Sequence, residues 1–217
     1  MAITVYTYNR ILSELGSDVR LVAVSKTRPA ADIQALYDLG QRDFGENYVQ
    51  ELTEKQPFLP ADIRWHFIGH LQSNKVKYII SFVHLIHGVD SLRLLKEIDR
   101  QGGAKGRVVD VLLQVHVARE ETKFGLDPAG LADIIQTLRA TPFPHVRVRG
   151  LMGMASFTED PDAVTAEFRE LKRLFDQYFA GADMPILSMG MSADYKIAIE
   201  EGSNMVRIGS LLFGKRD

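Results

Sequence analysis

The sequence contains no cysteine in its 217 residues. That absence excludes disulfide frameworks, thiolate zinc sites and cysteine nucleophiles. An excess of charge of one sign is also missing, because 26 basic and 28 acidic residues leave a formal net charge of -2. Since such a chain has no strong positive field to attract a polyanion, we expect neither a nucleic-acid partner nor an anionic membrane surface as a partner.

Long hydrophobic runs are missing as well. The segment 108–117 (VVDVLLQVHV) is interrupted by Asp110, Gln114 and His116, whereas a membrane helix needs about 18 or more apolar residues in succession. The N-terminal segment lacks the basic start and apolar stretch of a secretory signal. With 46% hydrophobic and 25% charged residues, the composition is typical of a globular protein. We expect one domain over residues 1–217, a monomer and a cytoplasmic location.

The sequence does contain a repeated alternation of short β-branched segments with amphipathic stretches, which is typical of parallel β-α units. Eight segments are predicted strands: residues 19–25, 42–46, 64–69, 85–89, 108–117, 147–154, 186–190 and 205–210. Between them, apolar residues recur at spacings of three and four, which is the helical period. Helices are accordingly predicted at residues 30–40, 73–82, 91–100, 129–140, 162–180 and 193–202.

A GxGxxG motif is lacking after the first strand, where a dinucleotide-binding sheet would carry it. The eight strand–helix units therefore predict a closed (β/α)8 TIM barrel, of class α/β, in preference to an open doubly wound sheet. The glycine-rich segment GGAKG at 102–106 lacks the spacing and the ending of a phosphate-binding loop. We interpret it as a flexible surface turn, with Gly102 following the end of a helix.

A lysine directly follows the first predicted strand. In LVAVSK, period-two alternation places Val22, Val24 and Lys26 on one face. If that face lines the barrel, the amine lies at the carboxyl end of an apolar strand, where barrels hold their active groups. Burial there would favour the neutral amine, which is the nucleophile that forms Schiff bases with aldehydes. The alternative is a lysine whose ammonium group reaches solvent.

The last predicted strand places an arginine on a face with small residues. Met205, Arg207 and Gly209 alternate onto one side of it. A guanidinium facing the lumen needs an acceptor, which an anionic or aromatic-nitrogen ligand, or a buried acid, would supply. Gly209 and the amides after it, with Ser188 and Gly190, follow strands seven and eight, where barrels bind phosphate through loop N–H groups. The alternative is a pair of ordinary glycine turns.

Two further segments carry polar residues near strand ends. His66 and His70 are four residues apart, but one lies in a predicted strand and the other beyond it, with no acidic residue close in sequence. We therefore predict no metal site. In GENY, Asn47 lies at the end of the second strand, where it could contact a ligand. Alternatively, Glu46 and Asn47 could cap the helix that follows.

Six segments, taken together and in this order, closely resemble the YggS/PROSC family of pyridoxal phosphate homeostasis proteins. They are AVSKT (23–27), FGENYVQE (44–51), WHFIGHLQSNK (65–75), LMGM (151–154), LSMGMSADYKIAIEEGS (187–203) and MVRIGSLLFGKRD (205–217). The resemblance implies the fold type III barrel of the alanine racemase N-terminal domain and pyridoxal 5'-phosphate (PLP) as the cofactor. It also implies that Lys26 carries PLP as a Schiff base, with Asn47 nearby. Three residues match the phosphate-binding elements of the family: Ser188, Gly209 and Ser210.

Arg207 matches the arginine that faces the pyridine nitrogen in this fold type. A permanently charged guanidinium there disfavours protonation of the nitrogen, and the ring is then a poor electron sink. Racemases of this fold add an opposed base from a second β domain, which we do not expect here because the chain ends soon after the eighth strand. We therefore predict PLP capture, storage and delivery to apo PLP-dependent enzymes, with no catalytic residue and little or no turnover.

Three other functions stay open on the sequence. An amino-acid racemase could borrow its second base from a neighbouring subunit. An aldolase acting on sugar phosphates would use Lys26 together with an acid or base beside it. A protein-binding scaffold without a ligand is the third alternative.

Overall fold

The strands of the computed structural model, which describes residues 5–120 and 124–214, form a closed parallel barrel. They follow one another around it in sequence order, and β1 pairs with β8 to close the ring. The strands are β1 (Arg20–Val24), β2 (Asp43–Glu46), β3 (Arg64–Phe67), β4 (Leu85–Val89), β5 (Val109–Gln114), β6 (Val146–Met152), β7 (Ile186–Met191) and β8 (Met205–Ile208). The predicted TIM barrel and all the predicted strands are confirmed, with differences of a few residues at the strand ends.

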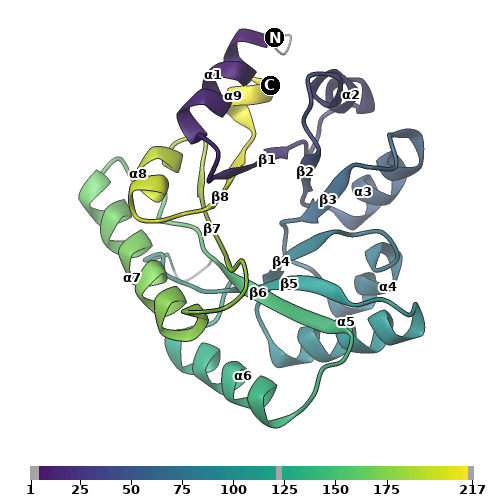
Figure 1. Ribbon diagram of the computed structural model, residues 1–217, viewed down its shortest axis with the longest axis vertical. Coiled ribbons are helices and arrows are strands. Elements are labelled where there is room, and N and C mark those ends of the chain that lie inside the picture. The colour runs from purple at the N-terminus through teal and green to yellow at the C-terminus, as the bar shows by residue number, and fades with distance from the viewer. Residues whose placement is uncertain (1–4, 121–123, 215–217) are drawn as a thin grey trace.

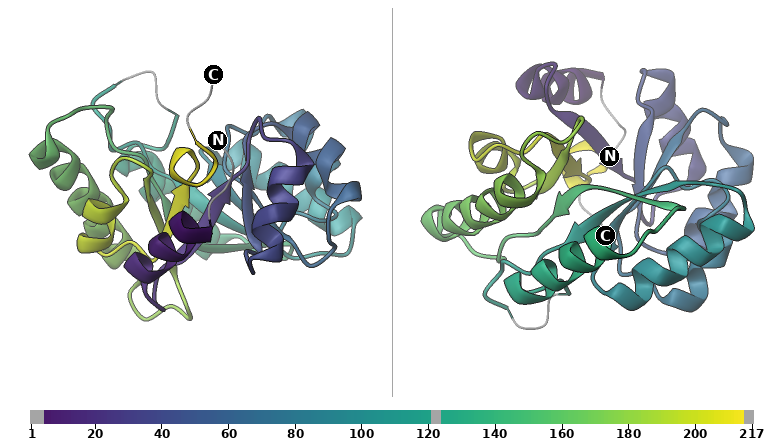
Figure 2. Two further views of the ribbon diagram at one scale, coloured as in Figure 1. Left: turned by 90° about the horizontal axis from the view of Figure 1, so that it is seen from above. Right: turned by 60° about the horizontal axis from the view of Figure 1, so that its bottom comes forward.

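Helices surround this barrel on the outside (Figure 1). In the described part of the chain they are α1 (Val5–Leu15), α2 (Ala30–Asp38), α3 (Val49–Lys55), α4 (Val76–Ile79), α5 (Leu92–Ala104), α6 (Pro128–Ala140), α7 (Pro161–Phe179), α8 (Tyr195–Glu200) and α9 (Ser210–Phe213). Two short 3-10 helices are η1 (Gln56–Phe58) and η2 (Ser73–Lys75). Figure 2 shows the same arrangement from two other directions, with the strands inside and the helices outside. None of these helices combines the length and the apolar character that crossing a membrane requires.

The GGAKG segment differs from its prediction. Helix α5 continues through Gly102 and Gly103 to Ala104, so the expectation that Gly102 follows the helix end is wrong, and the exposed turn is limited to Lys105 and Gly106. A Cβ atom at Gly102 would lie 2.9 Å from the carbonyl oxygen of Arg107 and 3.0 Å from the Cβ atom of His145. Glycine is required here because the helix end packs closely against the segments that enter β5 and β6.

The barrel interior contains a compact apolar cluster. Its members come from five different strands, so they can meet only inside the barrel: Val22, Leu85, Leu112, Met152 and Met205. On the other side of β8, Val206 and Ile208 belong to the larger core between the strands and the helices. The alternation predicted for the first and last strands is therefore confirmed, and Arg207 is placed inside the barrel.

Candidate cofactor-binding site

A cavity of about 860 Å³ lies at the carboxyl ends of the strands. Small-molecule sites usually have volumes of roughly 300–1,000 Å³. Its wall is made by the segments that follow β1, β2, β3, β6, β7 and β8. Five of the residues predicted to bind a cofactor line it: Lys26, Asn47, Arg207, Gly209 and Ser210. The fold therefore brings together residues that are up to 184 positions apart in the sequence, from 26 to 210.

Lys26 lies in the turn directly after β1 and is half-buried. Its neighbour Thr27 has a φ of 63°, a left-handed conformation that costs a residue with a Cβ atom roughly 1–2 kcal/mol. The amide of Thr27 donates to Oε1 of Glu51 on α3 at 2.5 Å. On the other side, Nζ of Lys55 donates to the carbonyl oxygen of Ser25 at 3.0 Å. Helix α3 thus holds the backbone on both sides of Lys26.

Glu46 lies beneath this turn and is fully buried at the end of β2. Its Oε1 accepts from Oγ of Ser25 at 2.7 Å and from Nζ of Lys55 at 2.8 Å, and Lys55 also pairs with Glu51 at 2.6 Å. Burial raises the pKa of Glu46, against the lowering by Lys55 and Ser25. The carboxyl group therefore stabilises the turn that positions Lys26.

Asn47 follows β2 and has a buried Oδ1 atom with no hydrogen-bond partner in the part of the chain that the structure describes. An acceptor left in this state costs about 1–3 kcal/mol, which a donor on a ligand would offset. A Cβ atom at Gly69 would lie 2.3 Å from the carbonyl oxygen of Asn47, so the close approach of β2 and β3 here requires glycine. The alternative that Glu46 and Asn47 cap α3 is wrong, because Tyr48 is the N-cap residue and no side chain caps that helix.

Arg207 is only 3% exposed, although its side chain lines the cavity. Its NH1 donates to the carbonyl oxygen of Ser188 at 2.9 Å and to the Ser188 Oγ at 2.7 Å, and its NH2 donates to the carbonyl oxygen of Gly153 at 3.0 Å. These acceptors are neutral, and Asp194 acts on the guanidinium only through its charge. Burial lowers the pKa of Arg207 to about 10, so the group is still a cation at neutral pH. A buried cation with neutral partners is suited to an anionic or electron-rich ligand.

Ser188 is placed differently from the other predicted site residues. It is the third residue of β7, fully buried, and it is absent from the residues described as lining the cavity. Its hydroxyl contacts Arg207 and, at 3.1 Å, Nδ1 of His87. Ser192, directly after β7, lines the cavity instead, and its Oγ accepts from the amide of Gly209 at 3.2 Å.

Among the lining residues that the sequence did not point to, Ser192 and Arg28 carry donors suited to an anion. Ser192 lies just beyond the end of β7, so the rule that barrel sites form at the carboxyl ends of strands could have selected it. Arg28 lies two residues after Lys26 and also lines the cavity, and its NH2 donates to the carbonyl oxygen of Gly214 at 2.6 Å. With Ser210, these side chains supply hydroxyl and guanidinium donors suited to a phosphate group.

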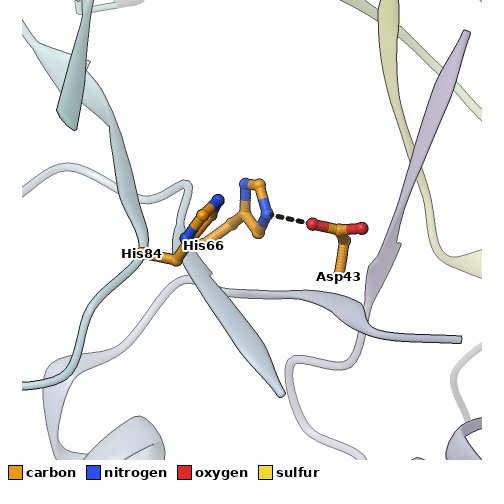
Figure 3. Close-up of side chains that lie close together, drawn as sticks. All are labelled: Asp43, His66 and His84. Carbon is orange, nitrogen blue, oxygen red and sulfur yellow. Dashed lines mark hydrogen bonds and ion pairs between the residues drawn. The ribbon is translucent and has the colours of Figure 1, made fainter. Parts of the chain in front are cut away.

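At the opposite end of the strands, Asp43, His66 and His84 lie close together (Figure 3). One ligand atom from each lies within 4.8 Å of the others. However, Arg64 donates to both carboxylate oxygens of Asp43, and Nε2 of His66 lies 2.9 Å from the same Oδ1. A metal ion would have to displace a charged guanidinium from this carboxylate. The geometry is that of an ion pair beside a buried imidazole, and the expected lack of a metal site stays a prediction.

Comparison with known proteins places the chain in a family. The model of the alanine racemase N-terminal domain family matches residues 6–217. The chain belongs to this family. A pyridoxal phosphate homeostasis protein of Aquifex aeolicus is 44% identical over 91% of this chain and 87% of that protein. A human protein of the same name is 40% identical over 91% of this chain and 77% of that protein. The resemblance seen in the six segments is confirmed.

A solved structure shows how far the likeness extends in three dimensions. PipY of Synechococcus elongatus PCC7942 is 37% identical and has been solved with PLP bound. Its PLP-bound structure matches with a TM-score of 0.85 over 96% of this chain and 99% of that one, and the structure without PLP matches with a TM-score of 0.90. The family and the barrel therefore agree across sequence and structure.

Proposed function

We propose that this chain binds PLP, holds it covalently through the amine of Lys26, and serves in PLP homeostasis by capture, storage and delivery. The observation that carries the proposal is the meeting of Lys26 and Arg207 in one cavity, in a chain 37% identical to PipY, whose structure contains PLP. The curated relatives named pyridoxal phosphate homeostasis proteins support the same assignment.

The residues of the cavity fit this cofactor. When bound, PLP supplies an aldehyde that an amine can attack and a pyridine ring that can withdraw electrons. The braced turn after β1 presents the amine of Lys26 at the cavity wall. Arg207 lines the cavity from the last strand and would face the ring nitrogen, as the family resemblance implies. The buried Oδ1 of Asn47 would offer an acceptor, because it has no partner among the described residues.

Other donors on the cavity wall are suited to the phosphate group of the cofactor. Ser192 and Ser210 offer hydroxyl groups and Arg28 offers a guanidinium, all on the cavity wall. Charge-assisted donors of this kind bind phosphate oxygens most strongly. We include Gly209 in this part of the site because it lines the cavity between Arg207 and Ser210, and its amide donates to Ser192 and so positions that hydroxyl.

Low turnover is part of the proposal. Because Arg207 carries a permanent charge, it disfavours a protonated ring nitrogen, and the ring then stabilises negative charge on a substrate poorly. Racemisation also needs two opposed acid–base groups. The described residues that line the cavity include no histidine and no tyrosine. Besides Lys26, their acid–base side chains are Glu159 and Asp194, and Oδ1 of Asp194 already accepts from the amide of Met191. We accordingly propose a carrier that transfers PLP to apo PLP-dependent enzymes in the cytoplasm.

The test compares wild type with Lys26→Ala after addition of PLP. Wild type should develop visible absorption and, after borohydride reduction, keep one pyridoxyl mass on the peptide that contains Lys26. Lys26→Ala should show neither, whereas the matched change Lys172→Ala, at a lysine paired with Asp176 on α7, should behave like wild type. A pyridoxyl mass on another peptide, or none on wild type, contradicts the proposal. Rapid exchange of an amino-acid α-hydrogen with solvent deuterium would favour the racemase alternative instead.

A further inference from the structure

A chain of hydrogen bonds runs through the barrel interior from Arg207 to the amino ends of the strands. NH1 of Arg207 lies 2.7 Å from Oγ of Ser188, which lies 3.1 Å from Nδ1 of His87. Nε2 of His87 lies 2.9 Å from Nδ1 of His66, whose Nε2 lies 2.9 Å from Oδ1 of Asp43. These residues belong to β8, β7, β4, β3 and β2. The chain therefore crosses the barrel and links the cavity to a carboxylate at the far end.

The hydrogen-bonded residues are almost fully buried. Ser188, His66 and His87 have no exposed surface, and Asp43 and Arg207 are 4% and 3% exposed. Burial lowers the pKa of both histidines below the ordinary value of 6.5, so both imidazoles are neutral at neutral pH.

The charged and titratable groups around the two rings lie on several elements. His66 is affected by Asp43, Arg64 and Arg20. His87 is affected by Arg207, His66 and His84. Of these groups, only Asp43 favours a charged imidazole, and desolvation outweighs it. The rings therefore act as neutral links that each donate once and accept once.

The direction of every hydrogen bond follows from the carboxylate end, and the arginine end is consistent with it. A guanidinium can only donate, so Arg207 donates to Ser188, whose hydroxyl hydrogen is then left for Nδ1 of His87. A carboxylate can only accept, and the Arg64 ion pair with other contacts holds the pKa of Asp43 well below its usual range. His66 must therefore donate from Nε2, which leaves its Nδ1 to accept from Nε2 of His87. The proton of each neutral histidine is therefore on Nε2, and Nδ1 of His87 accepts from Ser188.

We propose that Asp43, His66, His87 and Ser188 are positioning residues that orient Arg207 toward the ring nitrogen of the cofactor and set how strongly it donates there. This inference rests on the proposed function. Bonds that all point the same way polarise one another, by perhaps 10–30% for each bond. The carboxylate of Asp43 thereby strengthens the hydrogen bond from NH1 of Arg207 to Ser188. In this way a carboxylate at the opposite end of the barrel affects how strongly Arg207 donates to the cofactor.

The barrel offers a matched control for this carboxylate. Asp43 is opposite Arg64 in the register of β2 and β3, and Asp110 is opposite Arg147 in the register of β5 and β6. Each arginine donates to both oxygens of its aspartate. The two aspartates differ in their other partner. The carboxylate of Asp43 also accepts from His66, whereas that of Asp110 also accepts from Arg149.

The experiment compares Asp43→Asn with Asp110→Asn in the full chain, titrated with PLP. Asp43→Asn should weaken PLP binding roughly 2- to 30-fold, the range found for couplings between distant sites, and should shift the pH profile of the absorption of bound PLP. Asp110→Asn should leave both unchanged. Equal behaviour of the two variants overturns the inference, whereas failure of wild type to bind PLP overturns the proposed function.

A second measurement uses wild type without PLP, so neither a folding defect of Asp43→Asn nor a failure of the proposed function affects it. The nitrogen chemical shifts of the histidine rings report which ring nitrogen carries the proton. At neutral pH, His66 and His87 should both be neutral with the proton on Nε2. A proton on Nδ1 of either ring, or a charged ring, overturns the directed chain.

Discussion

Lys26 and Arg207 are cations on adjacent strands of the same barrel, and they are held in opposite ways. Lys26 lies in the turn beyond β1 and is half-buried, whereas Arg207 lies within β8, paired in register with Val22 of β1, and is 3% exposed. A lysine must lose a proton before it attacks a carbonyl, whereas an arginine keeps its charge even when buried. The reactive cation is therefore found at the rim of the barrel and the permanent one inside it.

The supports of the two residues differ accordingly. At Lys26, α3 holds the backbone through the amide of Thr27 and the carbonyl oxygen of Ser25. At Arg207, the protein holds the guanidinium itself through oxygens of Ser188 and Gly153. The side chain that must react is thus positioned through its backbone, and the one that must only donate is positioned through its guanidinium group.

The largest expected effect is the loss of covalent PLP binding when Lys26 is replaced by a residue of the same charge that cannot form an imine. In Lys26→Arg the positive charge stays, but a guanidinium does not form a stable imine, so covalent retention of PLP after borohydride reduction should fall to zero. Mass spectrometry of the intact protein measures the retained pyridoxyl mass, and Lys172→Arg on α7 serves as the control. Full retention in Lys26→Arg would show that another amine carries the cofactor.

The next effect concerns stability, for which Arg207 should matter more than Lys26. Arg207→Ala leaves the two carbonyl oxygens and the Ser188 hydroxyl without their donor, so it should lower the free energy of unfolding by about 3 kcal/mol or more. Lys26→Ala removes a half-buried side chain beyond the strand end and should cost about 1 kcal/mol or less. Urea unfolding of the two variants without PLP measures the difference. Similar losses in both would contradict the contrast drawn between them.

Acid should destabilise the folded protein through His66 and His87, the two histidines of the hydrogen-bond chain that ends at Arg207. The pKa of His66 and of His87 is lower in the folded chain than the ordinary 6.5, so below that pH the unfolded chain binds protons that the folded chain does not. The free energy of unfolding should therefore fall as the pH drops below 6.5, by up to about 1.4 kcal/mol per pH unit for each histidine.

Glu46 opposes this trend in part, because its raised pKa lets the folded chain take up a proton first as the pH falls. Urea unfolding from about pH 7.5 to about pH 5 measures the net slope. A free energy that is level over this range would show that the buried imidazoles titrate normally.

The smallest expected effect tests the strained turn beside Lys26. Thr27→Gly should remove about 1–2 kcal/mol of left-handed strain and add about 0.5–1 kcal/mol of unfolded-state entropy. The free energy of unfolding should accordingly rise by about 0.5–1 kcal/mol. Thr53→Gly, at a threonine in α3, should lower it by a similar amount because glycine is a poor helix residue. A loss of stability in both variants would mean that the turn carries no such strain.

Only part of the site could be predicted from local sequence patterns. Ser188 was selected with the phosphate-binding residues because it lies in SMGMS, but its hydroxyl contacts Arg207 and His87 inside the barrel. Asn47 could have been a helix cap until the structure placed Tyr48 in that position. For Asn47 the start of a helix decided the role, and element ends are hard to place from the sequence. For Ser188 the partners on other strands decided it.

The sequence by itself determined the alternation of strands and helices, the inward face of β1 and β8, and the two cations at the cavity, because these depend on periods of two and of three to four residues within short segments. Only the tertiary structure decided that α5 continues through Gly102 and that His66 and His87 meet. Side chains from five strands become neighbours only when the barrel closes. Their hydrogen bonds depend on that closure, which no local pattern specifies.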